Sequence, residues 1–340
     1  MLPTRAVAGR RCLPGARSAA GSSGSSGGAA RAAGAAAAAG AAAAARPGAQ
    51  QAAPRRRVFR FRDFDLDHGG AAHPMGTDAM LLGAWAAPPP GARGVLDVGT
   101  GCGVLALMAA QRSARDCVVH AIDVDAAAAA AAAANAAASP WAARVRVAAA
   151  SLQDWAAAAG AGGGDEGRGV APLVGGYDLV VTNPPFFERS TKPTAGRRAA
   201  ARHADVQLPL AELAACAARL LAPRGRLALI LPPPEAARFV DAASGAGLAL
   251  TDRLRVFTRP GDAEPKRHIM AFEPRPAPAG DAPGARPPPP APARDEALTV
   301  MATGARPDGT RGLVYSAAYH ALTAEFHHPT FAATWAPPPG

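Results

Sequence analysis

Four consecutive residues, Asn183, Pro184, Pro185 and Phe186, supply two carbonyl hydrogen-bond acceptors and an aromatic ring. The side-chain carbonyl of Asn183 and the backbone carbonyl of Pro184 could each accept a hydrogen from one amino group. Two such bonds would draw the nitrogen lone pair towards an electrophile without a strong base. Phe186 would stack on the base that carries the amine, with help from Phe187. The motif therefore predicts group transfer to a weakly nucleophilic nitrogen.

Two other interpretations of this motif stay open. Pro184 and Pro185 could simply end a buried strand, with Phe186 in the core. An amide nitrogen also poses the same lone-pair problem as an aromatic amine, so the motif alone does not separate a nucleic-acid base from a glutamine side chain. A base within a structured RNA would have to be extruded to reach such a site.

A glycine-rich turn between an expected strand and an expected helix indicates a bound nucleotide. Three glycines fall between Gly99 and Gly103, where the chain turns tightly and a ligand can approach the backbone. Asp123 ends the next strand, a position from which a carboxylate binds both ribose hydroxyls. The pattern is D-x-G-x-G-x-G, not the G-x-G-x-x-G of dinucleotide enzymes, and a turn without a ligand is the alternative. The expected cofactor contacts are Asp97, Gly99, Thr100, Gly101, Gly103 and Asp123.

One expected contact to a nucleotide base is missing. An acid usually follows the third strand, where it reads an adenine ring, and this chain has Ser151 there. Gln153 or Asp154 could substitute from the following turn. The alternative for Asp154 is a solvated position in the first turn of a helix.

Short apolar runs alternate with alanine-rich helical stretches from residue 93 onward, which predicts an α/β fold with a mainly parallel sheet and helices on both faces. Strands are expected at Gly94–Val98, Cys117–Ile122, Val145–Ala148, Tyr177–Thr182 and Gly225–Leu231, and helices at Val104–Arg112, Ala126–Ala138 and Leu210–Leu221. Further elements are expected at Glu235–Ala243, Leu250–Phe257 and His268–Phe272, with a closing strand and helix at Ala297–Met301 and Ser316–Phe326.

Composition divides the chain into segments. Residues 1–57 consist mainly of Ala, Gly, Ser and Arg without any acid, which is typical of a disordered organellar transit peptide; a high genomic GC content is the other explanation. The low-complexity insert and the Pro-rich loop are expected on the surface. The expected segments are a catalytic domain at 58–273 with an insert at 156–176, a Pro-rich loop at 274–294, a strand and helix packing on the core at 295–330, and a tail at 331–340.

The net charge of +10 does not identify a partner. Residues 1–60 hold ten Arg and no acid, and the remaining 26 Lys and Arg balance the 26 Asp and Glu. The four cysteines show neither paired spacing nor accompanying His, so we expect no metal, no disulfide and a reducing compartment. No apolar run approaches the roughly 20 residues of a membrane span. We therefore expect a soluble protein in a plastid or mitochondrion, with the cytoplasm as the alternative.

Further segments are diagnostic of a family. Phe59–Phe64, Gly76–Trp85 and Ser139–Trp141, together with the glycine turn and Asn183–Phe186, resemble the class I methyltransferases with a small catalytic domain. The similarity is strongest to the bacterial tRNA adenine-N6 methyltransferases that modify nucleotide 37 of a valine tRNA. It covers roughly residues 59 to 272, and more loosely the end of the chain.

This resemblance implies a Rossmann-like fold with a seven-stranded, mostly parallel sheet, S-adenosylmethionine as cofactor and tRNA as substrate. It also places Thr77 and Asp78 near the methionine moiety of the cofactor. A helix cap at Thr77 is the alternative. A monomer without a membrane or metal partner is expected.

A cationic segment follows the Asn-Pro-Pro-Phe motif. No acid lies between Glu188 and Asp205, and a charge run beside a base-binding strand end would hold phosphates, although such runs are often only solvated surface. The expected RNA contacts are Phe187, Arg189, Lys192, Arg197, Arg198 and Arg202. A second, weaker group consists of Arg253, Arg255, Arg259, Lys266 and Arg267.

Three competing functions remain. Glutamine-directed protein methyltransferases share the Asn-Pro-Pro-aromatic motif. Guanine-N2 methyltransferases of rRNA share the fold, but they typically have His where this chain has Phe187. A non-catalytic RNA-binding assembly factor is supported only by Ser151, since loss of the base-reading acid would weaken cofactor binding.

Overall fold

The computed structural model describes residues 57–68, 75–160, 171–173, 176–184, 208–275, 291–306 and 309–330. The chain divides into two units, Met1–Gln51 and Ala52–Gly340, and all described residues belong to the second. The expected transit peptide therefore lies outside the described residues, apart from Arg57. The same is true of most of the Pro-rich loop and of the tail at 331–340.

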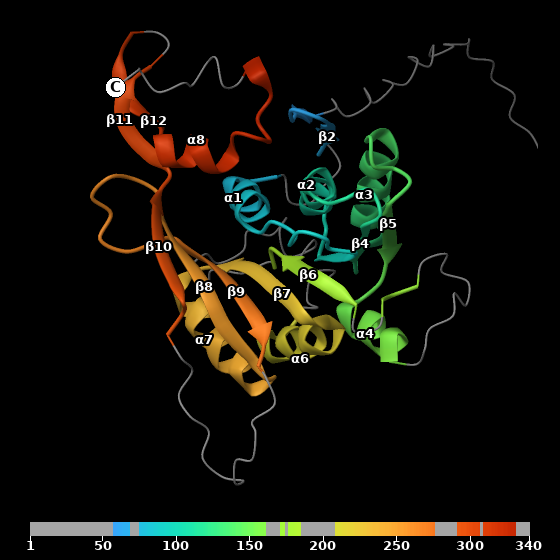
Figure 1. The fold of residues 1–340 in the computed structure, drawn as a ribbon. Helices are drawn as coiled ribbons and strands as arrows, with labels where there is room; N and C mark the ends of the chain where they lie inside the picture. Colours follow the sequence, from blue (N-terminus) through green and yellow to red (C-terminus); the bar gives the residue numbers. More distant parts are fainter. Residues whose placement is uncertain are drawn as a thin grey trace, which may run out of the picture. The chain divides into compact units, whose positions relative to one another are not determined.

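A mostly parallel sheet with helices on both faces forms the centre of the described unit, which confirms the expected fold class (Figure 1). Within this sheet only β9 runs antiparallel to its neighbours. The expectation of seven strands is wrong, because β10 adds an eighth beside β8. In spatial order the strands are β10 (Arg294–Thr299), β8 (Leu248–Phe257), β9 (Arg267–Pro274), β7 (Leu221–Leu231), β6 (Tyr177–Thr182), β3 (Gly94–Val98), β4 (Val118–Asp123) and β5 (Val145–Ala149).

Two layers of helices bury the two faces of this sheet, each over its own apolar cluster. The central strand β3 is buried along its whole length, as expected for a parallel strand covered on both sides. One face carries α1 (Thr77–Trp85), α2 (Val104–Arg112) and α3 (Ala126–Ala138), and the other carries α4 (Leu152–Gly160), α6 (Leu210–Leu220) and α7 (Pro233–Gly245) (Figure 1).

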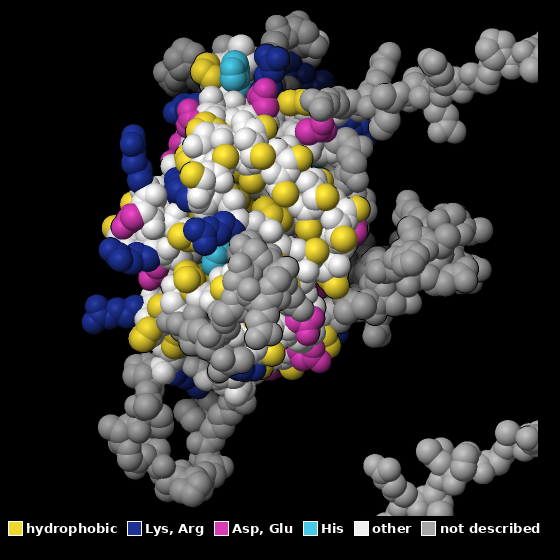
Figure 2. All heavy atoms as spheres, turned by 90° about the vertical axis from the view of Figure 1, so that its right-hand side faces the viewer, with side chains coloured by type: hydrophobic (Ala, Val, Ile, Leu, Met, Phe, Trp, Pro, Cys, Tyr) yellow, Lys and Arg dark blue, Asp and Glu magenta, His cyan; other side chains and the backbone are white. Residues whose placement is uncertain are grey.

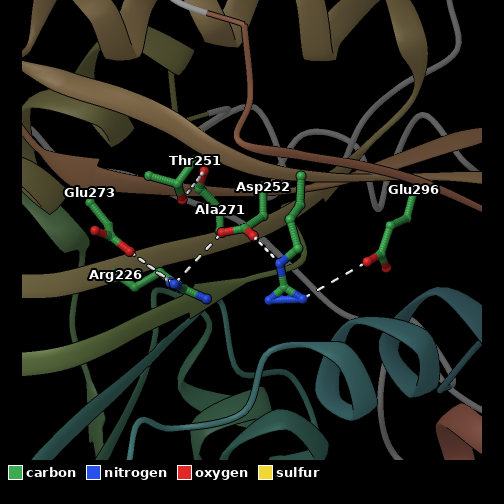
Figure 3. A network of polar contacts seen from close by, with 7 residues as sticks. Arg226, Thr251, Asp252, Ala271, Glu273 and Glu296 are labelled. Carbon is green, nitrogen blue, oxygen red and sulfur yellow. Dashed lines mark hydrogen bonds and ion pairs between the residues drawn. The ribbon is translucent and has the colours of Figure 1, made fainter.

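A network of ion pairs links the eighth strand to the strands beside it (Figure 3). Asp252 of β8 is 7% exposed, and an unpaired buried carboxylate would be costly. Its Oδ2 lies 3.6 Å from Arg226 Nη2 of β7, and its Oδ1 lies 3.0 Å from Arg294 Nε of β10. Arg226 also pairs with Glu273 of β9 at 2.9 Å. β10 thus supplies a second cation to a carboxylate that the sheet buries.

The expected insert at 156–176 is not entirely a surface loop. Residues up to Gly160 continue α4, and Ala156 and Ala159 are buried against the sheet. Trp155 anchors this helix by donating from Nε1 to the hydroxyl of Tyr177 at 3.1 Å. Alanine is compatible with both a core helix and a low-complexity loop, so composition alone misassigned this boundary.

The two ends of the described unit meet on the face that carries α1 and α2. The N-terminal hairpin of β1 (Val58–Arg60) and β2 (Asp65–Asp67) includes Phe61 in its turn, which bridges to His327. After β10 the chain forms a second hairpin, β11 (Met301–Ala305) and β12 (Arg311–Tyr315), and then α8 (Ala317–Thr323), which packs on α1.

Phe326 anchors this end of the chain. Its side chain is fully buried, and the Arg112 guanidinium lies 5.4 Å from the ring centroid. Arg112 Nε in turn pairs with Glu325 at 2.6 Å. The C-terminal segment is therefore part of the core of this unit.

We expect Phe326→Ala to lower the free energy of unfolding by about 3 to 5 kcal/mol, because it removes a fully buried ring and leaves a cavity. Urea unfolding followed by circular dichroism measures this change. Val58→Ala is the control: Val58 is 46% exposed, so its loss should cost about 0.5 kcal/mol or less. Equal, small effects of the two substitutions would show that the C-terminal segment does not stabilise the core.

Candidate active site

The carboxyl ends of three neighbouring parallel strands bring the candidate residues to one edge of the sheet. The register pairs Asp97 of β3 with Ala121 of β4 and with Val181 of β6. The turn after β3, Asp123 at the end of β4 and Asn183 after β6 therefore lie at the same edge. Ligands of open α/β sheets bind at this edge.

The glycine turn is a well-bonded loop with a backbone conformation that favours glycine. Gly99, Gly101 and Gly103 have φ values of 68°, 57° and 87°, which side chains rarely tolerate. A Cβ at Gly99 or Gly101 would meet no atom within 4 Å, whereas one at Gly103 would lie 3.3 Å from Ala132 of α3. The first two glycines thus leave backbone open to a ligand, and the third permits close packing of α3.

Asp97 is a fully buried carboxyl group next to this turn. Its Oδ2 accepts hydrogen bonds from Thr100 Oγ1 at 2.6 Å and from the Ala106 amide at 3.0 Å. Its Oδ1 is buried and has no hydrogen-bond partner in the described part of the chain. Burial raises the pKa of Asp97 to about 7, although the two hydrogen bonds oppose that shift. A buried carboxyl oxygen without a described partner thus lies beside the loop.

Asp123 holds the turn and still has free acceptor capacity. Its Oδ2 accepts from the Gly101 amide at 2.8 Å and its Oδ1 from the Asp125 amide at 2.9 Å. Each carboxylate oxygen has a second lone pair, so hydroxyl groups of a ligand can still bind. The next residue, Val124, presents an apolar side chain that is 62% exposed. Sequence reasoning missed Val124, although an apolar residue directly after the acid was a visible signal.

The residues after β5 form a helix cap. Ser151 Oγ donates to Asp154 Oδ2 at 2.8 Å and accepts from the Asp154 amide at 3.1 Å, so its hydroxyl caps the start of α4. Gln153 Nε2 donates to Glu212 Oε2 at 2.7 Å. Asp154 therefore takes the alternative role considered for it, in the first turn of a helix.

Thr77 and Asp78 lie at the start of α1. The N-cap is Gly76, and no side chain caps the helix, so the alternative role of Thr77 as a cap is wrong. Asp78 accepts a hydrogen bond from Arg267 Nε of β9 at 2.8 Å, and both side chains are partly buried. Asp78 is thus fixed by an ion pair to the central sheet.

Asn183 and Pro184 are half-buried at the end of β6. The preceding residue, Thr182, is buried and donates from Oγ1 to the Val98 carbonyl of β3 at 2.9 Å. This bond ties the end of β6 to the residue that precedes the glycine turn. Thr182 was missed in the sequence, where it looked like an ordinary strand residue. The predicted residues Pro185, Phe186, Phe187, Arg189, Lys192, Arg197, Arg198 and Arg202 lie outside the described residues.

The second group of candidate RNA contacts is largely paired. Arg253 and Arg255 both bind Asp295 of β10, Arg255 Nε at 3.0 Å, and Arg267 binds Asp78. These pairs reduce the positive charge that made the group a candidate for RNA binding.

The side of the molecule formed by α3 carries mainly small hydrophobic side chains (Figure 2).

In the described ranges, no helix is long and apolar enough to cross a membrane. No group of three or more His, Cys, Asp or Glu side chains in those ranges could hold a metal ion. The described cysteines, Cys102, Cys117 and Cys216, are free thiols.

One family profile and several solved structures resemble part of the chain. A family profile for ribosomal protein L11 methyltransferase (PrmA) matches residues 69–160, the part that holds the glycine turn. A predicted O-methyltransferase from Agrobacterium tumefaciens is 18% identical with a TM-score of 0.49, covering 74% of this chain and 97% of its own. A ribosomal protein L11 methylase from Lactobacillus delbrueckii is 19% identical with a TM-score of 0.40, covering 62% and 83%.

Relatives found by sequence are more similar to this chain than the solved structures are, and they share one name. A protein of Phocaeicola vulgatus named tRNA1(Val) (adenine(37)-N6)-methyltransferase is 38% identical over 216 residues, which cover 63% of this chain and 83% of the relative. Proteins of the same name from Tolumonas auensis and Aeromonas hydrophila are 38% and 40% identical, over 84% and 80% of their lengths and 64% and 61% of this chain. Identity at this level over most of a relative's length extends beyond the cofactor loop. The chain therefore belongs to the tRNA1(Val) (adenine(37)-N6)-methyltransferase family.

Proposed function

We propose that this protein transfers a methyl group from S-adenosylmethionine to the N6 amine of an adenine in tRNA, next to the anticodon of a valine tRNA. The observation that carries the proposal is the shared edge of β3, β4 and β6, where a glycine turn with an open buried acceptor lies beside the Asn183–Pro184 corner. The family named above contributes the choice of adenine and of tRNA.

The residues of the loop suit a nucleoside cofactor with a cationic amino-acid end. Gly99 and Gly101 leave backbone exposed, Asp123 offers acceptors for ribose hydroxyls, and the Oδ1 atom of Asp97 awaits a donor. Val124 provides an exposed apolar surface for the adenine ring. Thr77 and Asp78 would face the methionine end. When bound, S-adenosylmethionine supplies an activated methyl group on its sulfonium.

Asn183 and Pro184 act on the amine that receives this group. Two carbonyl acceptors at one corner hold both amine hydrogens, which directs the nitrogen lone pair outward and stabilises the positive charge that develops on the nitrogen. Proline restricts the backbone at this corner, so one acceptor is fixed before the base arrives. In this proposal the next residue in the motif is a second proline, Pro185, and Phe186 would stack on the base with help from Phe187.

Related functions differ in substrate rather than in chemistry. A glutamine amide or a guanine N2 amine could be held by the same corner, and the family profile for ribosomal protein L11 methyltransferase covers only residues 69–160. The adenine-N6 relatives match a longer part of the chain, 216 residues for the one from Phocaeicola vulgatus. This difference favours adenine in tRNA over the other substrates and over a non-catalytic assembly factor.

The location and organisation of the chain belong to the same proposal. An organellar location rests only on the composition of residues 1–57, and the cytoplasm remains the alternative. We also propose a catalytic domain at 58–273 and a C-terminal strand and helix at 295–330, acting as a monomer.

Nucleoside mass spectrometry tests this function. Purified protein with S-adenosylmethionine should convert an adenosine of a valine tRNA transcript to N6-methyladenosine. The control is the same transcript with guanosine at position 37, which should remain unmodified. Methylation of guanosine, or of protein glutamine with none of RNA, would overturn the proposed substrate.

We expect Asn183→Ala to lower kcat about 100-fold or more, because one of the two acceptors for the amine is removed. Cofactor affinity, measured by calorimetry with S-adenosylhomocysteine, should stay within about twofold, since Asn183 binds the base and not the cofactor. The control is Asp241→Ala, an exposed residue of α7, which should leave kcat within about twofold of the wild type. If Asn183→Ala retains near wild-type kcat, the assigned role is wrong.

The free energy of unfolding of the cofactor-free protein should depend on pH through the ionisation of Asp97. Its pKa is about 7 in the folded protein, above the ordinary value of 3.8, so ionisation disfavours folding. This contribution to stability is complete below about pH 4 and declines as the pH rises towards 7. Asp97→Asn removes this decline, so the variant should gain stability relative to the wild type across this range, by about 4 kcal/mol at most. Urea unfolding of both proteins at several pH values measures the difference, and parallel curves would contradict the assignment.

We expect Arg197→Ala with Arg198→Ala to weaken tRNA binding and to lower the slope of log affinity against log salt by about 0.7 to 0.9 for each phosphate that the variant no longer binds. Filter binding at several salt concentrations measures the slope. Cofactor affinity should be unchanged. The control is Arg93→Ala with Arg115→Ala, which removes two exposed cations from the opposite edge of the sheet. Equal slopes for the two double variants would refute phosphate binding by the cationic segment.

A further inference from the structure

One polar side chain interrupts an otherwise all-alanine helix at the point where that helix meets the glycine turn. Twelve of the thirteen residues of α3 are Ala, and the exception is Asn135. Alanine gives this helix its stability, and Asp125 caps it by accepting from the Ala127 amide. Asn135 contributes little to helix formation, and it is 5% exposed on the inward face. Its presence there calls for a specific partner.

The amide of Asn135 has three backbone partners in two other segments. Its Oδ1 accepts from the Asp67 amide at 3.0 Å, and its Nδ2 donates to the Asp67 carbonyl at 2.9 Å. The second Nδ2 hydrogen is directed to the Cys102 carbonyl at 2.8 Å. Asp67 is the last residue of β2, and Cys102 belongs to the glycine turn. One planar amide therefore joins α3, the N-terminal hairpin and the turn.

The contact to Cys102 completes a set of bonds that fix the whole turn. The Gly99 and Thr100 amides donate to the Ile122 carbonyl at 2.9 and 3.0 Å, and the Gly101 amide donates to Asp123. The Gly103 amide returns to the Thr100 carbonyl at 2.8 Å. Bonds from β4 therefore fix the first half of the turn. The second half of the turn is bonded to α3 through the hydrogen bond from Asn135 to Cys102. This bond lies beside the close approach of Gly103 to Ala132.

We propose that Asn135 is a positioning residue for the cofactor: its side-chain amide holds the Cys102 carbonyl and β2 together, and so keeps the glycine turn in its binding conformation. The inference rests on the proposed cofactor and adds a residue remote from the cofactor contacts themselves. Gly99 and Gly101 have φ values that a free loop would exchange with others. Holding them in advance lowers the conformational cost of binding.

The test is cofactor binding by the full chain with Asn135→Asp. Aspartate keeps the shape and can still accept from the Asp67 amide, but it places a carboxylate against two carbonyl groups. We expect the dissociation constant for S-adenosylhomocysteine to rise about tenfold or more. KM for S-adenosylmethionine should rise similarly, while kcat and KM for tRNA change by less than about twofold, because the amine-binding corner is untouched. Asn135→Ser, which reaches at most one of the three partners, should have the same effect and replaces the Asp variant if that one does not fold.

The matched control is Ser139→Ala at the end of the same helix. Ser139 is also buried, but its hydroxyl bonds locally to the Ala136 carbonyl and the Trp141 amide. This variant should lower thermal stability without changing cofactor affinity. Wild-type affinity in folded Asn135→Asp or Asn135→Ser, or an equal decrease in affinity in Ser139→Ala, would overturn the inference. Absence of cofactor binding by the wild type would instead overturn the proposed function.

Discussion

The alignment of the carboxyl ends of β3, β4 and β6 is the constraint on which the site depends. In a parallel sheet the register of neighbouring strands fixes which residues emerge together, and here it brings the glycine turn, Asp123 and Asn183 to one edge. Side-chain bonds reinforce this register where the strands end. Thr182 binds the last carbonyl of β3, and Asp123 binds the turn that follows it. A shift of one residue would turn Asn183 to the opposite face.

Burial then gives the residues at this edge their chemical character. Asp97 is excluded from water, which raises its pKa to about 7, and one of its oxygens has no partner in the described part of the chain. Asn135 is also buried, yet both of its amide hydrogens and its carbonyl oxygen are bonded. One side chain is therefore left open for binding, and the other is committed to holding the loop. The same low-polarity surroundings strengthen both roles.

Much of this edge could be predicted from sequence, because its signals are local. The bounds of β3, α2, α3 and β6 follow directly from short apolar runs separated by glycine or alanine-rich stretches, and the structure confirms them. The boundary of α4 could not be predicted, since alanine does not distinguish a buried helix from a loop. A strand was expected at Ala297–Met301, but its place as the eighth strand of the sheet was not, because it pairs with β8 residues that are far apart from it in the chain. The partners of Asn135 and Thr182 are long-range in the same way.

The central claim is that an amine is held at the Asn183 corner while the glycine turn presents the cofactor. A crystal structure with S-adenosylhomocysteine and an RNA fragment containing the target adenosine tests it most directly. The account predicts that Asn183 Oδ1 and the Pro184 carbonyl both lie about 3 Å from N6 of that adenine. A complex in which the base is bound but Asn183 points into the protein interior, away from N6, would contradict the account.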